Sequence, residues 1–71
     1  MSDSVYKIIE LVGTSPKSWE EAVQNVIEKA SKSLRELRIA EVQKLDAKIE
    51  NGKILFYRAR VTVSFKYQPK D

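Results

Sequence analysis

The segment from Ile54 to Tyr67, ILFYRARVTVSFKY, alternates between two kinds of side chain without interruption. Strict alternation over this length predicts one long β-strand that buries a single face. Such a strand extends about 45 Å, whereas most strands have about 5–6 residues. It is therefore longer than the core of a small chain requires. The apolar or aromatic phase of the alternation contains Leu55, Tyr57, Ala59, Val61, Val63, Phe65 and Tyr67.

Composition narrows what can stabilise a domain of this size. The chain has 71 residues, with no cysteine and no histidine. Without cysteine the chain can form neither disulfides nor thiolate metal sites. Without histidine it lacks the commonest metal ligand and the commonest general base. Because a hydrophobic core alone is marginal at this length, association with other copies is the main support that remains. We expect one domain over residues 1–71, ordered over about residues 4–67 and flexible over residues 68–71.

The first half of the chain predicts a strand and a helix. Val5–Val12 is rich in β-formers and apolar on both faces, which is typical of a strand covered on both sides. Residues 13–16 have the composition of a turn. Ser18 then begins a helix that ends at about Arg35, with Glu21 completing a capping box. Its apolar stripe has helical spacing and consists of Trp19, Ala22, Val23, Val26, Ile27, Ala30 and Leu34.

Residues 37–49 predict a second, irregular strand. Leu37 and Ile39 share one phase of the alternation, Val42 lies in the other, and Leu45 returns to the first. This phase change indicates a β-bulge or two covered faces. The sequence Glu50-Asn51-Gly52-Lys53 follows, and Asn-Gly between two strands is typical of a type I′ hairpin turn. The second strand therefore pairs antiparallel with the long one.

The predicted order of elements is strand, helix, strand, strand, in an α+β fold. The helical stripe covers one face of a three-stranded antiparallel sheet that wraps around it. We expect copies of the same chain to cover the other face, because exposed apolar surface and bare strand edges favour aggregation. The apolar residues of this second face are Tyr6, Ile8, Ile54 and Phe56.

Three segments of the chain resemble the dodecin family. They are VYKIIELVGTSPKSWEEAVQNVIEKA, LRELRIAEV and YRARVTVSFK, and the resemblance extends from about Val5 to Lys66. It implies the family fold, β-α-β-β, and the family assembly, a hollow homododecamer. It also implies a binding or storage protein whose ligands lie between subunits. An enzyme is disfavoured, because the chain contains no nucleophile motif.

The same resemblance locates a ligand pocket at Ile39, Ala40, Glu41 and Arg58. Flavin-binding dodecins stack the isoalloxazine ring on a tryptophan where this chain has Ile39. They hydrogen-bond its polar edge with a glutamine where this chain has Arg58. Isoleucine has no π face, and arginine offers donors only, so we expect binding of FMN or riboflavin to be weak or lost. Sequestration of FMN or riboflavin, as in typical dodecins, stays the alternative.

Ions are the other candidate ligands. Because it lacks the flavin-stacking tryptophan, the chain resembles most the calcium-dodecin-like members of the family, and this resemblance implies a divalent cation such as calcium. Hard cations such as calcium prefer several oxygen ligands, and the candidate carboxylates are Glu41, Asp46 and Glu50. An anion site is the opposite alternative, formed by Arg58, Arg60 and Lys66 on one strand face. We expect Arg58 and Arg60 to form salt bridges between chains, with Glu41 or Asp46 of a neighbouring strand.

Two further expectations concern partners and location. The net charge of +3 comes from thirteen basic and ten acidic residues that are interleaved along the chain. Arg58, Arg60, Lys66 and Tyr67 suggest a nucleic-acid surface, but the aromatic and basic residues alternate between faces, which disfavours it. Absence of cysteine and of a signal peptide or membrane-spanning segment favours the cytoplasm. Trp19 opens the helix on its apolar stripe, so we expect it to pack rather than to bind ligand.

Overall fold

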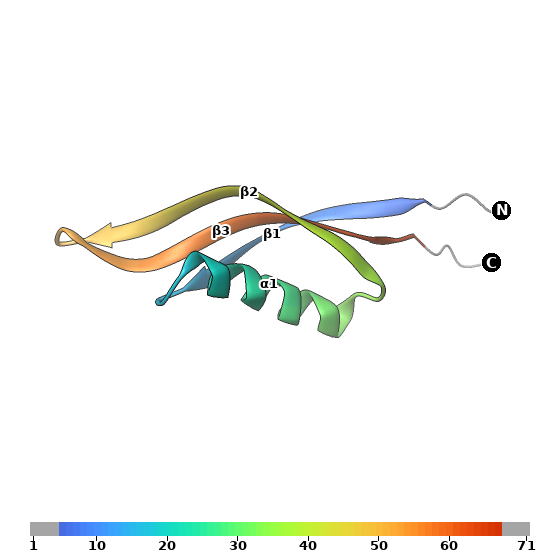
Figure 1. The fold of residues 1–71 in the computed structure, drawn as a ribbon, viewed down its shortest axis with the longest axis horizontal. Coiled ribbons are helices and arrows are strands. Elements are labelled where there is room, and N and C mark those ends of the chain that lie inside the picture. Colours follow the sequence, from blue (N-terminus) through green and yellow to red (C-terminus); the bar gives the residue numbers. More distant parts are fainter. Residues whose placement is uncertain (1–4, 68–71) are drawn as a thin grey trace.

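The computed structural model describes residues 5–67. Its elements are β1 (Tyr6–Ser15), α1 (Trp19–Ser33), β2 (Leu37–Glu50) and β3 (Lys53–Lys66). The strands form one antiparallel sheet in the order β1-β3-β2, and α1 packs against one face of it (Figure 1). The α+β, β-α-β-β prediction is confirmed. Residue 4 and the tail 68–71, whose order the sequence also addressed, lie outside the described part of the chain.

Strand β1 is longer than the sequence predicts. The predicted turn at residues 13–16 is wrong for its first three residues, which continue the strand and pair with Ala59, Arg58 and Tyr57 of β3. Gly13 is buried there, and a Cβ atom at this position would collide with the carbonyl oxygen of Ala22 in α1. Gly13 therefore allows α1 to approach the sheet closely rather than turning the chain.

Helix α1 begins as predicted, and its first turn is held by two serines. Ser18 is the N-cap, and its side chain accepts a hydrogen bond of 3.0 Å from the Glu21 backbone N–H. The Glu21 carboxylate accepts from the Ser15 hydroxyl at 2.5 Å, in place of the Ser18 backbone N–H that a full capping box uses. Ser15 thereby ties the end of β1 to the start of α1.

Helix α1 ends at Ser33, two residues before the predicted end at Arg35. Leu34 is already extended, with φ −116° and ψ 143°, while its N–H donates to the Ala30 carbonyl at 2.8 Å. Glu36 has a φ of +56°, in the left-handed region that few side chains favour. The chain reverses at this point to enter β2, which is why the helix stops early. None of the helices in residues 5–67 is long and apolar enough to cross a membrane.

The β2–β3 hairpin contains both the predicted type I′ turn and a β-bulge. Asn51 and Gly52 have φ values of +53° and +74°, as a type I′ turn requires. The register of β2 against β3 shifts between Val42 and Lys44, so that Gln43 is the extra residue of a β-bulge. This bulge explains the phase change seen in the sequence. The hairpin projects past the N-terminal end of α1 (Figure 1).

The core is small and lies between α1 and the middle of the sheet. Small residues dominate it, and the radius of gyration is 14.9 Å, against about 11 Å for a compact chain of this length. The face of the sheet away from α1 has no cover in one copy: Ile8 is 65% exposed and Ile39 is 67% exposed. The buried core residues are Ala22, Val26, Ala30, Ala59, Val61 and Val63.

Candidate functional site

The uncovered face of the sheet, which we call the outer face, carries the residues that the sequence singles out. Residues directly opposite one another in an antiparallel sheet share a face. Opposite Ser64 of β3 lie Ile8 of β1 and Ile39 of β2. The even-numbered positions of β3 from Phe56 to Lys66 thus belong to the outer face. Its members with charged or polar side chains are Glu10, Thr14, Glu41, Lys44, Asp46, Lys48, Arg58, Arg60, Thr62, Ser64 and Lys66.

A shallow hollow of about 220 Å³ lies on this face across all three strands. Its rim combines two apolar side chains with one carboxylate and two hydroxyls. The Ser64 hydroxyl donates to the Ile39 carbonyl at 3.4 Å, and the Thr62 hydroxyl accepts from the Gln43 side chain at 3.3 Å. The polar atoms that the hollow presents are mainly oxygens. It is lined by Ile8, Ile39, Glu41, Thr62 and Ser64.

One copy of the chain does not bring the four predicted pocket residues together. Ile39 and Glu41 line the hollow, whereas Ala40 is opposite Val63 and therefore on the helix-facing side. Arg58 lies on the outer face six residues along β3 from Ser64, or about 20 Å away. A pocket that contains both Ile39 and Arg58 requires two copies of the chain.

Arg58 already has a partner within the chain. Its Nε donates to Asp46 Oδ1 at 2.7 Å and its Nη2 donates to Asp46 Oδ2 at 2.8 Å, a bidentate pair across directly opposite positions of β3 and β2. The expectation of a salt bridge between chains is therefore wrong for Arg58 and Asp46, because these two residues pair within one chain. The hairpin register aligns the two residues, and a planar fork matches a carboxylate well.

The ion pair perturbs both of its members. The hydrogen bond from Arg58 holds the pKa of the Asp46 carboxyl below its usual range, assisted by the charges of Arg58, Arg60 and Lys44. The same hydrogen bond raises the pKa of Arg58. Both side chains are about half exposed, so water and salt screen their attraction.

Acidification should therefore remove the contribution of Asp46 to stability. A carboxyl group whose pKa is lower in the folded state than in the unfolded state stabilises the folded state fully at pH values above the unfolded pKa of about 3.9. That stabilisation is lost as the pH falls through the folded pKa. We expect the parent to melt at a slightly higher temperature than the Asp46→Asn variant at neutral pH, and the difference to disappear as the pH falls through the lowered pKa of Asp46. Thermal melts from neutral to acidic pH measure this. A difference that stays constant would show that the ion pair is not its cause.

The three candidate anion-binding residues are not clustered. Arg58 and Arg60 are neighbours on the outer face, but Lys66 lies six residues beyond Arg60, about 20 Å along β3. The residue directly opposite Arg60 on β2 is Lys44, which the sequence did not single out. Counting back from the Asn-Gly turn would have paired Arg60 with Gln43 instead, because the register shifts by one residue between Lys48 and Ile49.

The three candidate metal-binding carboxylates are likewise spread along β2. Glu41 lies opposite Thr62, Asp46 opposite Arg58, and Glu50 opposite Lys53 at the turn. Within the described residues, no group of three or more acidic side chains is placed to hold a metal ion. A cation site of several oxygens would have to combine residues from more than one copy.

Trp19 has a structural position near the hairpin. Its ring meets Tyr57 edge-on, with centroids 4.8 Å apart, and its indole N–H donates to the Asp46 backbone carbonyl at 2.9 Å. These contacts attach the start of α1 to β2 and β3, as the packing interpretation of Trp19 predicts. Tyr57 and Phe65 lie on the helix-facing side of β3, opposite to Arg58 and Arg60. This separation disfavours a nucleic-acid surface of stacked aromatics and cations.

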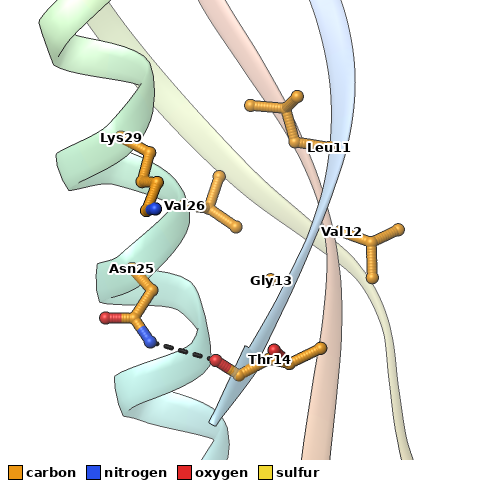
Figure 2. Close-up of a pocket in the computed structure, with 7 residues that line it drawn as sticks. All are labelled: Leu11, Val12, Gly13, Thr14, Asn25, Val26 and Lys29. Atoms are coloured by element: carbon orange, nitrogen blue, oxygen red, sulfur yellow. Dashed lines mark hydrogen bonds between the residues drawn. The ribbon is translucent and has the colours of Figure 1, made fainter.

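A second hollow, of about 340 Å³, lies between the free edge of β1 and α1. Asn25 donates from its side chain to the Thr14 carbonyl at 3.0 Å and thereby spans it, while Val12 points away from the helix (Figure 2). Lys29 is the charged residue of this hollow. None of the residues that the sequence predicts for a ligand site lies here. The lining consists of Leu11, Val12, Gly13, Thr14, Asn25, Val26 and Lys29.

Fold and sequence together define the class of protein. The dodecin family model matches residues 5–68, so the chain belongs to the dodecin family. Its sequence is 39% identical to the calcium dodecin of Mycobacterium tuberculosis over 66 residues, which are 93% of each chain. It is 36% identical to a dodecin of Thermus thermophilus over 64 residues, which are 90% of this chain and 93% of that one.

Solved structures agree with this assignment. A dodecin from Streptomyces coelicolor superimposes with a TM-score of 0.93 at 33% identity, covering 99% of this chain and 100% of that one. The calcium dodecin from Mycobacterium tuberculosis superimposes with a TM-score of 0.83 at 38% identity, covering 96% of this chain and 97% of that one. It is described as having a novel calcium-binding site.

Proposed function

We propose that this chain is a non-enzymatic binding or storage protein that assembles as a dodecin-type homododecamer and holds its ligand between copies. The observation that carries the proposal is the outer face, which is rich in apolar side chains and has no cover in one copy. The hollow around Ile39 and Glu41 is open on this face. A ligand enclosed there would be covered by a neighbouring copy rather than by the chain itself.

We further propose that the ligand is a hard cation such as calcium and that flavin binding is lost. The geometry of Arg58 argues against flavin, because its donors are already directed at Asp46. Ile39 offers no flat surface for a ring to stack on. Likeness to the calcium dodecin supports a cation, and so do the oxygen atoms that the outer face presents.

Calcium should stabilise the assembled protein, whereas riboflavin should not. Binding to the folded state alone raises the free energy of unfolding by about 2.7 kcal/mol at a free ligand concentration of one hundred times Kd. We expect the melting temperature to rise with added calcium chloride and to return after a chelator is added. A melting temperature that does not change over a wide range of calcium concentrations would contradict the cation assignment.

The flavin half of the experiment has a matched control. The double variant Ile39→Trp/Arg58→Gln restores both groups that flavin-binding dodecins use, and it should quench riboflavin fluorescence more strongly than the parent does. Quenching by the parent that equals that of the double variant would instead favour sequestration of FMN or riboflavin.

A further inference from the structure

The turn between β2 and β3 places a side-chain amide next to an unhindered backbone nitrogen. Asn51 and Gly52 are the two central residues of this turn, and both are exposed. Beyond the two chain neighbours of Gly52, no atom of residues 5–67 lies within 4 Å of the place where its Cβ would be. The amide nitrogen of Gly52 is therefore open to approach by the side-chain carbonyl carbon of Asn51.

Neither of the two groups is engaged in a hydrogen bond of the turn. The ladder between the strands closes at the pair Glu50 and Lys53, so the N–H of Gly52 lies outside it. Among the residues that the structure describes, none forms a hydrogen bond with the side-chain amide of Asn51. The amide can therefore rotate without breaking an existing contact.

The end of the hairpin that carries this turn is weakly held. It projects past the N-terminal end of α1, so the helix does not cover it (Figure 1). The register of β2 against β3 shifts between Lys48 and Ile49, just before the turn. Ile49 is 67% exposed and Ile54 is 49% exposed in one copy. Segments with so few buried contacts open locally at a small part of the cost of global unfolding.

Asn25, the other asparagine of the chain, provides an internal comparison. Its side chain donates to the Thr14 carbonyl at 3.0 Å, and the residue after it is the buried, β-branched Val26 of α1. An N–H inside a helix donates to the carbonyl four residues back, so the nitrogen of Val26 is engaged. The two asparagines thus have opposite environments.

We propose that Asn51 is a site of spontaneous deamidation through a succinimide ring. The amide nitrogen of Gly52 forms a bond to Cγ of Asn51, the bond from Cγ to Nδ2 breaks, and the amide proton leaves with Nδ2 as ammonia. Water then opens the ring. Hydrolysis at Cγ gives aspartate, and hydrolysis at the main-chain carbonyl carbon gives isoaspartate. The reaction consumes only water, and it does not depend on the proposed function.

The reaction changes the turn as well as its charge. Each event replaces a neutral amide by a carboxylate, which lowers the net charge of +3 by one. In isoaspartate the main chain runs through Cβ and Cγ and is therefore longer by one atom. A two-residue type I′ turn has no place for this atom, so the pairing of Glu50 with Lys53 should be lost in that product.

Mass spectrometry of tryptic peptides, taken after the folded protein is incubated at mildly alkaline pH, tests the proposal. We expect the peptide that contains Asn51 to exchange an NH group for an oxygen atom, and the peptide that contains Asn25 to stay unchanged. A synthetic peptide of residues 46–57 gives the rate without a fold. The rate in the folded protein should lie within about a hundredfold of it, which corresponds to an opening cost below about 2.7 kcal/mol.

The Gly52→Ala substitution in the synthetic peptide is the matched control for the chemistry. Its methyl group crowds the attacking nitrogen, so we expect the reaction to slow at least about tenfold, or about 1.4 kcal/mol in the activation free energy. A control peptide that reacts as fast as the parent peptide would exclude the succinimide route. Folded protein in which Asn51 reacts more than a hundredfold more slowly than the peptide, or no faster than Asn25, would show that the turn protects its amide and would overturn the proposal.

Discussion

The Gly13→Ala variant should lose a large part of its free energy of unfolding. An added methyl group at this position would lie far inside van der Waals contact with the Ala22 carbonyl oxygen and with a methyl group of Val26. The first of these neighbours is helix backbone, so β1 and α1 would have to separate along the core. Overpacking of this kind costs about 3 kcal/mol, a large share of the stability of so small a domain. Urea unfolding followed by circular dichroism measures the loss.

Gly52 provides the matched control for this substitution. It has a φ of +74° in the hairpin turn, and nothing lies within 4 Å of the position where its Cβ would be. The Gly52→Ala variant should therefore lose about 1 kcal/mol, from backbone strain alone. If Gly13→Ala is no more destabilising than Gly52→Ala, then α1 does not approach the sheet as closely as the structure shows.

The Ile8→Lys variant should fail to assemble. Ile8 is 65% exposed in one copy, and substitutions at such positions usually change stability by less than about 0.5 kcal/mol. If copies cover the outer face, the same change buries an ammonium group in the contact between copies. We expect a loss of about 3 kcal/mol or more per contact, which raises the concentration needed for assembly about a hundredfold. Light scattering over a dilution series measures the midpoint.

The control for Ile8→Lys introduces the same charge elsewhere. Glu28 is exposed on α1, and Glu28→Lys should leave the assembly midpoint where the parent has it. An Ile8→Lys variant that assembles like the parent would mean that solvent, and not another copy, covers this part of the outer face.

Sequence patterns predicted most of the fold because each depends on local chemistry. The alternation from Ile54 to Tyr67 and the Asn51-Gly52 turn are sufficient to identify the β2–β3 hairpin. The phase change near Val42 predicted an irregularity, and the structure identifies the bulge at Gln43 as its cause. Gly13 was misinterpreted because glycine serves both turns and close approaches. The distinction depends on α1, which is remote in sequence.

Less of the candidate site than of the fold could be predicted from the sequence. Pairing of Arg58 with Asp46 inside one chain depends on the hairpin register, which shifts by one residue between Lys48 and Ile49 after the turn has set it. Lys44 was missed for the same reason. The ligand residues inferred from the family resemblance, Ile39 and Arg58, lie far apart in one copy. Their relation is a property of the assembly, and no pattern within a single chain expresses it.

Sedimentation of the unmodified protein over a wide range of concentrations, with a melting temperature at each, tests most directly whether copies cover the outer face. We expect one assembly with the mass of a dodecamer of the 8.2 kDa chain, and a melting temperature that falls once dilution releases single copies. Folded single chains whose melting temperature does not change on dilution would contradict this picture, because the outer face would then be stable in contact with water.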